Sequence, residues 1–143
     1  QQPQGKPTQY CHKIYFAETD QAGVVHHSNY INYLEAGRIE YLNTIGYPYH
    51  AMQADKVGLA PVDIQIQYKS PLRLEDQYIV TTAPIKFTHA SLTMKQTVTK
   101  QDGTLCTEAI IKLACLDESV FKPIHLPNEL LEKVHEFEED NLK

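Results

Sequence analysis

The sequence predicts an α+β domain in which one long helix is wrapped by a curved antiparallel sheet of five strands. One segment near the amino end repeats its apolar residues with helical spacing, and later segments alternate apolar and polar residues as strands do. The order is strand, helix, four strands and a short final helix. The helix must bury one face of the sheet, and pairing with a second copy is a common way to manage the remaining edge.

The first expected element is a strand over residues 10–16. Aromatic and apolar side chains alternate there with their neighbours at Tyr10, His12, Ile14 and Phe16. Residues 1–8, which read QQPQGKPT, are polar and contain two prolines, so we expect a frayed terminus. With 143 residues in all, the chain has the length of one domain, which we place at residues 9–143.

The long helix is expected to begin near Ser28 or Asn29, because either side chain can accept a hydrogen bond from a free helix amide. Apolar residues follow at nearly helical spacing at Ile31, Leu34, Tyr41, Leu42 and Ile45. Gly37 allows this face to approach a neighbouring element closely. Gly46, with Pro48 just beyond it, is expected to end the helix.

Four further strands are expected after the helix, at residues 62–68, 76–87, 91–101 and 104–116. The dipeptide of Asp102 and Gly103 is typical of a hairpin turn between the last two strands. Residues 128–143 have the spacing of a short amphipathic helix with an acidic end, which we interpret as a solvated face.

The composition limits the possible partners. The net charge is −5 and only two residues are arginines, whereas proteins that grip nucleic acid usually carry a positive balance. No apolar run is long enough to span a membrane, and no secretory leader is evident. The three cysteines, Cys11, Cys106 and Cys115, are odd in number and widely spaced, which predicts free thiols in a reducing, cytoplasmic location.

The stretch ETDQAGVVHHSNY, residues 18–30, places a turn directly before the long helix. Asp20 can be an ordinary turn residue before Gly23. It also lies a few residues from helix amides that lack a partner within the helix and carry a partial positive charge. A carboxylate beside such donors suits attack on an acyl carbon, either as a nucleophile or as a base for water. This chemistry requires the Asp20 carboxylate to face a cleft beside those amides.

Other polar residues in this region have more than one interpretation. His26 and His27 fit a turn or a helix cap, and no spacing typical of a metal site accompanies them, so we expect no metal. Glu35 and Arg38 lie three residues apart and can form a surface ion pair, or can orient the site or a subunit interface. Glu18 is in phase with the preceding strand and is interpreted as an exposed acid. Motifs for a serine nucleophile or a nucleotide are absent from the sequence.

The run YFAETDQAGVVHHSNYINYLEAGR resembles the signature of hotdog-fold acyl-CoA thioesterases of the 4-hydroxybenzoyl-CoA thioesterase class, in its YbgC-like branch. The matching positions are Tyr15, Phe16, Glu18, Asp20, Ala22, Gly23, Val24, His26, His27, Tyr30, Glu35 and Arg38. The segments IQYKSPLRLED and FKPIHLP resemble later landmarks of the family, so that the likeness covers roughly residues 10–127. The family often has Tyr in place of His26 and Asp in place of Glu18.

The resemblance implies a hotdog fold and hydrolysis of a thioester between an acyl group and coenzyme A or a carrier-protein pantetheine, with no separate cofactor. It implies that Asp20 is the catalytic carboxylate, that the backbone amide near His27 polarises the thioester carbonyl, and that the His27 side chain assists. Residues implied to bind substrate are Gly23, Val24, His26, Tyr30, Glu35, Lys69 and Arg73, and Lys86 and Lys95 are further candidates for the phosphates of coenzyme A. The family also implies homodimers with sites built from both subunits, often pairing into homotetramers.

Two other functions remain open on the same fold. One is a hydratase or dehydratase that acts on acyl thioesters, and the other is a module that binds acyl thioesters without turnover. The acyl group is not specified by the sequence, because aliphatic and aromatic groups both fit an apolar pocket. Coenzyme A and a carrier protein are likewise not distinguished.

Overall fold

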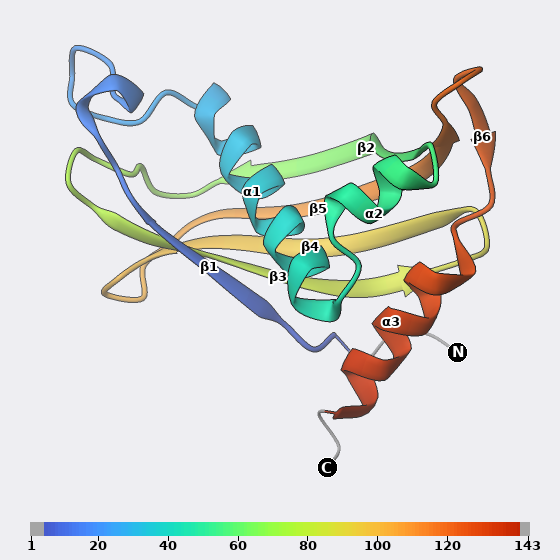
Figure 1. Cartoon of the computed structure of the whole chain (residues 1–143). Helices are drawn as coiled ribbons and strands as arrows, with labels where there is room; N and C mark the ends of the chain where they lie inside the picture. The colour runs from blue at the N-terminus through green and yellow to red at the C-terminus, as the bar shows by residue number, and fades with distance from the viewer. Residues whose placement is uncertain (1–4, 141–143) are drawn as a thin grey trace.

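The computed structural model of this protein describes residues 5–140. Figure 1 shows an antiparallel sheet with the helices gathered on one side of it. The strands are β1 (Thr8–Lys13), β2 (Val57–Tyr68), β3 (Gln77–Phe87), β4 (Ser91–Lys100), β5 (Leu105–Asp117) and β6 (Lys122–Ile124). Five of them lie in the order β1-β3-β4-β5-β2, and β6 pairs with the end of β5. β1 and β2 therefore form the two edges of the sheet.

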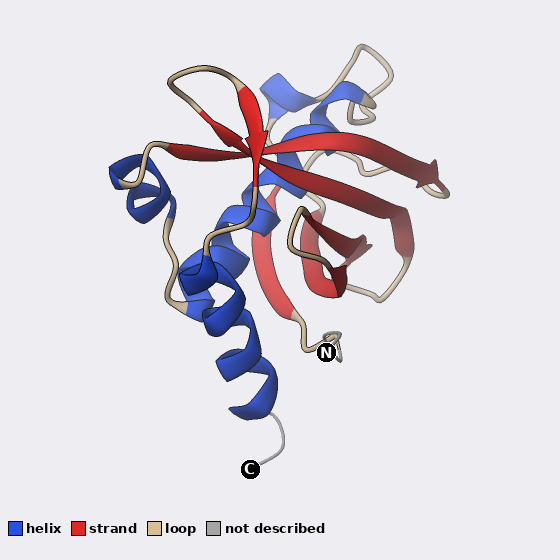
Figure 2. Cartoon of the chain, turned by 90° about the vertical axis from the view of Figure 1, so that its right-hand side faces the viewer, coloured by secondary structure: helices blue, strands red, loops and turns tan. Residues whose placement is uncertain are grey.

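The long helix α1 (Ser28–Ile45) crosses the inner face of this sheet, which confirms the expected architecture. Figure 2 shows the strands curving around the helices. The face of α1 that carries Leu34 and Tyr41 is fully buried. It contributes to one hydrophobic core together with Val80 of β3, Leu92 of β4 and other inward residues of the sheet. The helix ends at Gly46, whose φ of 91° is a left-handed conformation that glycine adopts readily.

Gly37 marks the closest approach of α1 to the sheet. A Cβ atom at this position would lie 2.5 Å from Val80 Cγ1 and 2.9 Å from Thr82 Oγ1. Gln96, a fully buried residue of β4, donates from Nε2 to the Leu34 carbonyl at 2.8 Å and to Thr82 Oγ1 at 2.9 Å. The predicted close contact at Gly37 is confirmed. It allows the Gln96 side chain of the sheet to hydrogen-bond the backbone of α1.

The first strand is shorter than the sequence predicts. β1 ends at Lys13, and the chain then forms a short 3-10 helix, η1 (Phe16–Glu18). The alternating pattern fails here because the Glu18 carboxylate accepts the Tyr15 N–H at 2.7 Å through Oε2 and bends the chain into a turn. The alternation places Phe16 on the same face as Ile14, but Phe16 lies beyond the bend and is 79% exposed, whereas Ile14 is fully buried.

The later strands match the predicted segments, with irregularities at prolines. β2 begins at Val57 rather than residue 62, and its pairing with β5 shifts between Pro61 and Asp63. A second shift, between Pro84 and Lys86, interrupts the pairing of β3 with β4. Proline cannot donate a ladder hydrogen bond, which explains why both shifts begin at a proline. The predicted hairpin turn is confirmed, since Gly103 has a φ of 90° between β4 and β5.

Two helices and the chain ends complete the fold. The short helix α2 (Tyr49–Ala54) and strand β6 were not predicted, and α3 (Asn128–Asp140) confirms the expected final helix. Residues 1–4 of the expected frayed terminus and residues 141–143 of the expected helix lie outside the described residues. Thr8 was predicted to be frayed but is the first residue of β1. Within residues 5–140, no helix is both long enough and apolar enough to cross a membrane.

Candidate active site at the start of the long helix

The turn that carries Asp20 is closed by its own backbone. The Asp20 N–H donates to the Val24 carbonyl at 2.8 Å, and the Gly23 N–H donates to the Asp20 carbonyl at 3.0 Å. Gly23 has a φ of 80°, which this tight turn requires. The Asp20 carboxylate accepts the N–H groups of Ala22 and Val24 through Oδ1, at 2.8 and 3.3 Å. The side chain is exposed, and no residue among 5–140 donates a hydrogen bond to its Oδ2.

The first turn of α1 leaves one backbone donor free. His27 occupies the position before the helix, and its N–H has no acceptor within the described part of the chain. The prediction that Ser28 or Asn29 caps the helix is wrong. The Ser28 N–H instead donates to His26 Nδ1 at 3.2 Å, and Asn29 Nδ2 donates to the Glu18 carbonyl at 3.0 Å. The imidazole of His26 therefore takes over part of the capping, because its unprotonated Nδ1 accepts a helix amide that has no partner within the helix.

A groove of about 270 Å³ opens beside this helix start. Its lining residues are Val25, His27, Tyr30, Tyr68, Lys69, Ser70 and Pro71. Tyr68 Oη donates to the His27 carbonyl at 3.4 Å, and its ring lies edge-on to that of Tyr30. Tyr30 Oη in turn accepts the Leu72 N–H at 2.9 Å. The groove thus brings together three of the predicted residues, His27, Tyr30 and Lys69.

Asp20 does not line this groove within one chain, and its side chain is exposed there. The turn is short and uses one carboxylate oxygen to hold its own amides. The turn nevertheless stays anchored to the helix start, because the His26 N–H donates to the Glu18 carbonyl at 3.3 Å.

Glu18 has a structural role that the sequence did not reveal. Its Oε1 accepts a 2.5 Å hydrogen bond from Tyr33 Oη, its Oε2 accepts the Tyr15 N–H, and its carbonyl accepts both the His26 N–H and Asn29 Nδ2. Burial and the hydrogen bond to Glu18 raise the pKa of the Tyr33 phenol well above its ordinary value. The interpretation of Glu18 as an exposed acid is therefore wrong. The helical spacing of Tyr33 and Tyr30 was the signal available, since it places both phenols near the helix start.

The predicted basic residues separate into two groups. Arg73 forms an isolated backbone bridge with Val24, and the neighbouring Leu74 N–H donates to the Gly23 carbonyl at 3.3 Å, so this loop lies against the Asp20 turn. Lys69 lines the groove at His27. Lys86 instead lines a groove with Thr93 and Lys112, and Lys95 is exposed on β4, whose even-numbered residues face the core. Of the four candidates for phosphate contacts, Lys69 and Arg73 lie near the helix start and Lys86 and Lys95 lie on the outer face of the sheet.

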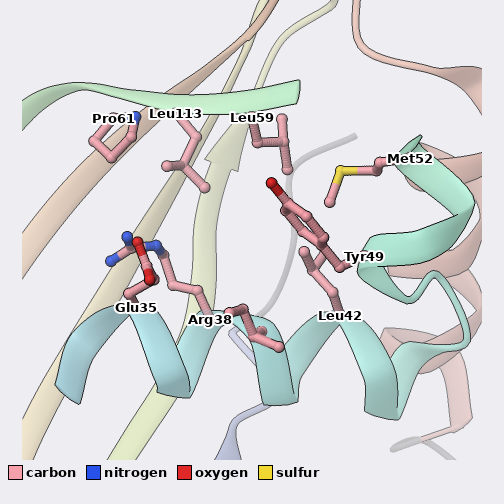
Figure 3. A pocket seen from close by; sticks show the side chains of 9 residues that line it. Glu35, Arg38, Leu42, Tyr49, Met52, Leu59, Pro61 and Leu113 are labelled. Carbon is pink, nitrogen blue, oxygen red and sulfur yellow. The ribbon is translucent and has the colours of Figure 1, made fainter. Parts of the chain in front are cut away.

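Glu35 and Arg38 lie farther along α1, in a second and larger pocket of about 360 Å³ (Figure 3). Its other lining residues are Ile39, Leu42, Tyr49, Met52, Leu59, Pro61 and Leu113. The two side chains form no ion pair within 4.0 Å, so the predicted surface pair is absent from the single chain. Arg38 is only 8% exposed, and burial lowers the pKa of its guanidinium while the nearby charge of Glu35 opposes this shift.

Among residues 5–140, no three His, Cys, Asp or Glu side chains come together in a group that could hold a metal ion. The three cysteines are free thiols, as predicted, with Cys11 exposed and Cys106 and Cys115 buried. The helix start therefore offers organic groups for chemistry: an exposed carboxylate on a fixed turn, a free backbone amide, and an imidazole beside a groove.

Comparisons with known proteins place this chain in a family. The model of the thioesterase-like superfamily matches residues 14–134. Acyl-CoA thioester hydrolase YbgC of Escherichia coli is 29% identical over 119 residues, which cover 83% of this chain and 89% of that protein. A Bacillus subtilis protein named putative acyl-CoA thioesterase YneP is 32% identical over 78% of this chain and 81% of its own length.

Solved structures show the same fold. The DHNA-CoA thioesterase from Staphylococcus aureus superposes with a TM-score of 0.84 at 26% identity, covering 94% of this chain and 95% of that one. The hotdog arrangement of one long helix within a curved sheet is thus common to both. Because the superfamily model matches most of the sequence and the relatives align over most of their length, this chain belongs to the thioesterase-like superfamily.

Proposed function

We propose that this protein hydrolyses acyl thioesters of coenzyme A at the start of α1, releasing a carboxylic acid and a free thiol. The observation that carries the proposal is the His27 N–H, which has no acceptor among residues 5–140 and lies at the positive end of an 18-residue helix beside a groove. A thioester carbonyl oxygen placed against this donor gains stabilisation as negative charge develops on it.

Asp20 supplies the second group that the reaction needs. As a base, its carboxylate takes a proton from a water molecule, whose oxygen adds to the carbonyl carbon. The carbon–sulfur bond then breaks, and the sulfur leaves as a thiolate, whose parent thiol has a pKa of about 8.5. Direct attack by the carboxylate uses the same geometry: it expels the thiolate and gives a mixed anhydride, which water then hydrolyses to the free acid and the regenerated Asp20 carboxylate. The free Oδ2 of Asp20 is available for either role, because Oδ1 is held by the turn.

We infer that a second copy of the chain completes the site. Asp20 is exposed in the single subunit, whereas such a reaction requires a carboxylate shielded from bulk water. β2 is an edge strand of 12 residues, and its inward residues Ile64 and Tyr68 are 40% and 47% exposed although they face the helix side of the sheet. Pairing of two β2 edges would cover these side chains and extend the sheet across a homodimer.

The outer face of the sheet supports a further step of assembly. The odd-numbered residues of β4 are left partly exposed on this face, which no helix covers within the described residues. We propose that two dimers pair through it into a homotetramer. A reducing, cytoplasmic location fits the three free thiols, and the proposed reaction uses no cofactor apart from the coenzyme A of its substrate.

The groups near the helix start suit the carrier as well as the acyl carbonyl. Lys69 lines the groove at His27 and Arg73 lies against the Asp20 turn, and both can bind the phosphates of coenzyme A or of a pantetheine arm. His26 and His27 stack with ring centroids 4.4 Å apart, which fixes the imidazole of His27 at the mouth of the groove. The ring of Tyr30 lines the same groove, and Gly23 and Val24 belong to the turn that carries Asp20.

Substitution of Asp20→Asn tests the proposal. The variant should keep its fold and its affinity for coenzyme A, while the release of free thiol from acyl-CoA should fall by about 10²- to 10⁴-fold. Asp102→Asn is a matched control, because Asp102 is also an exposed turn residue whose Oδ1 accepts an N–H two residues ahead, that of Thr104. Hydrolysis at near the full rate by Asp20→Asn would rule out this role for Asp20.

The same assay separates the alternative functions. A hydratase or dehydratase would change the acyl group without releasing thiol from any acyl-CoA of a panel. A module that only binds would show affinity without either reaction. A panel that offers each acyl group on coenzyme A and on a carrier protein identifies the carrier.

A further inference from the structure

The larger pocket on α1 differs from the groove at His27 in having a charged end and an apolar end. In Figure 3, Glu35 and Arg38 rise from α1 at one end, below Pro61 and Leu113. The opposite end is formed by Leu42, Tyr49, Met52 and Leu59. The volume of about 360 Å³ falls within the range of small-molecule sites.

Arg38 is mostly buried, but in the described part of the chain none of its nitrogens is fully enclosed without a partner, so its remaining donors stay accessible. A guanidinium carries five N–H donors. Within residues 5–140, Arg38 makes one hydrogen bond, from Nη1 to Gln96 Oε1 at 3.1 Å, and no carboxylate lies within 4.0 Å of it. The residue nevertheless keeps only 8% of its surface exposed. Donors that remain accessible on a pocket wall are free to bind the acceptor oxygens of a group that enters the pocket and displaces water.

Gln96 holds the guanidinium of Arg38 from the side of the sheet. Gln96 is fully buried and is itself held by the Leu34 carbonyl and by Thr82 Oγ1. Its Oε1 is thereby directed at Arg38. The close approach of α1 at Gly37 makes this network possible, because a side chain there would occupy the space of Gln96 Nε2 at 3.1 Å. The guanidinium is therefore preorganised beside the pocket.

The pocket also lies on the same side of α1 as the proposed reaction centre. Residues 27, 31, 35, 38 and 42 are three or four apart and form one stripe along the helix. Glu35 is eight residues beyond His27, a distance of about 12 Å along the axis, and helical side chains lean back toward the amino end. An acyl group whose carbonyl rests on the His27 N–H can follow this stripe into the pocket.

On the basis of the proposed thioesterase function, we propose that this pocket holds the acyl group and selects acyl groups that carry an acceptor oxygen at their distal end, which Arg38 binds. The oxygen belongs to a hydroxyl or to a carboxylate. A hydroxyl can accept from Arg38 and donate to Glu35, whereas a carboxylate binds Arg38 while the exposed Glu35 turns to solvent. A plain hydrocarbon chain would leave the guanidinium donors unpaired, which is the basis of selection.

The test compares coenzyme A thioesters that differ only at the distal end. One series is hexanoyl, ω-hydroxyhexanoyl and adipoyl, and the second is decanoyl, ω-hydroxydecanoyl and sebacoyl. We expect kcat/KM for at least one oxygenated member of a series to exceed that of its plain partner by about tenfold or more. The member preferred within a series shows whether the oxygen is a hydroxyl or a carboxylate.

Three variants connect the preference to Arg38. Arg38→Met should abolish the preference for oxygenated acyl groups and favour the plain hydrocarbon chain. Replacement of a buried charge by an apolar residue of similar volume is compatible with folding. Arg38→Lys keeps the charge and should retain part of the preference, which keeps the test available if the methionine variant does not fold. Lys112→Met is the control, since Lys112 is an exposed cation on the outer face of the same sheet.

The outcomes separate this inference from the proposed function. Equal or lower kcat/KM for both oxygenated members in both series overturns the inference, as does a preference that survives in Arg38→Met. If no thioester is hydrolysed, the proposed function fails, and the same series is then compared by thermal shift of the intact protein. An oxygen-dependent shift that disappears in Arg38→Met supports the pocket assignment, and the lack of such a shift overturns it.

Discussion

Tyr33 Oη donates a 2.5 Å hydrogen bond to Glu18 Oε1, which connects the buried face of α1 to the turn that carries Asp20. The other carboxylate oxygen of Glu18 holds the Tyr15 N–H, and its carbonyl holds the N–H of His26. Glu18 therefore holds both the segment that leads into the Asp20 turn and the segment that joins this turn to the helix. The relative placement of the Asp20 carboxylate and the free amide of His27 depends on this connection.

We expect Tyr33→Phe to lower kcat by about 10- to 100-fold while KM changes little, because a small misplacement of reacting groups costs rate rather than binding. The free energy of unfolding should fall by only about 1 kcal/mol, the usual contribution of one hydrogen bond. Steady-state kinetics and urea unfolding measure the two effects. Glu18→Gln, which keeps the acceptor for Tyr33 but not the one for the Tyr15 N–H, should fall between wild type and Tyr33→Phe in rate.

Tyr78→Phe provides the matched control for this effect. The Tyr78 ring stacks on that of Tyr33 at 4.6 Å, but its phenol makes no hydrogen bond to Glu18. Its loss should leave kcat within about twofold, since no contact to the turn is removed. Equal rate losses for Tyr33→Phe and Tyr78→Phe would attribute the effect to the aromatic cluster in general.

Gly37→Ala should destabilise the protein although alanine favours helix by about 1 kcal/mol over glycine. The new Cβ would lie 2.5 Å from Val80 Cγ1, so β3 or α1 must move, and overpacking of this kind costs about 1–3 kcal/mol or more. The steric cost exceeds the gain in propensity, so we expect a net loss in the urea midpoint. Thr44→Ala, at an exposed position of the same helix, should be neutral or stabilising, and a stable Gly37→Ala would contradict the close approach.

The fold was predictable because its signals are periodic and local. Helical spacing gave α1, alternation gave five strands, and glycines marked the end of the helix and the β4–β5 turn. The bend after Lys13 was missed because a side-chain carboxylate, that of Glu18, overrides the alternating pattern through one hydrogen bond. The short helix α2 was missed because six residues are too few to show a period.

The site was predictable in its residues but not in its contacts. The sequence brought Asp20 and His27 together because the turn and the helix start are adjacent along the chain. It could not show that His26 caps the helix or that Arg38 meets Gln96, which lies 58 residues away. Contacts between distant segments depend on register and packing, and neither property is visible in a local pattern. The local pattern likewise does not specify what surrounds Asp20, which is exposed in the single chain.

Alkaline pH should destabilise the protein through its buried tyrosines. Burial raises the pKa of Tyr47 from 10.0 to about 12, and it also raises the pKa values of Tyr30, Tyr33, Tyr41 and Tyr78. A raised pKa means that the unfolded state loses its proton first. The resulting stability is complete below the unfolded value and is lost as pH rises through the folded one. The urea midpoint should therefore fall between about pH 10 and pH 12, and Tyr47→Phe should lessen the fall in this window. An unchanged midpoint across the window would contradict the burial of these phenols.

Ile64→Lys should separate the proposed dimer and remove activity with it. Ile64 pairs with Ile111 on the inner face of the sheet but remains 40% exposed, so a second β2 edge is expected to cover it. A lysine there would place a charge inside that interface, which is a common means of blocking edge-to-edge pairing. Light scattering should show single chains, and hydrolysis should fall steeply with dilution. Gln67→Lys introduces the same charge at an exposed position on the other face of the same strand, in register with Glu108, and should leave the β2-paired dimer and its rate intact. A single-chain Ile64→Lys protein with full activity would mean that Asp20 needs no second subunit, since the exposed turn would then complete the reaction alone.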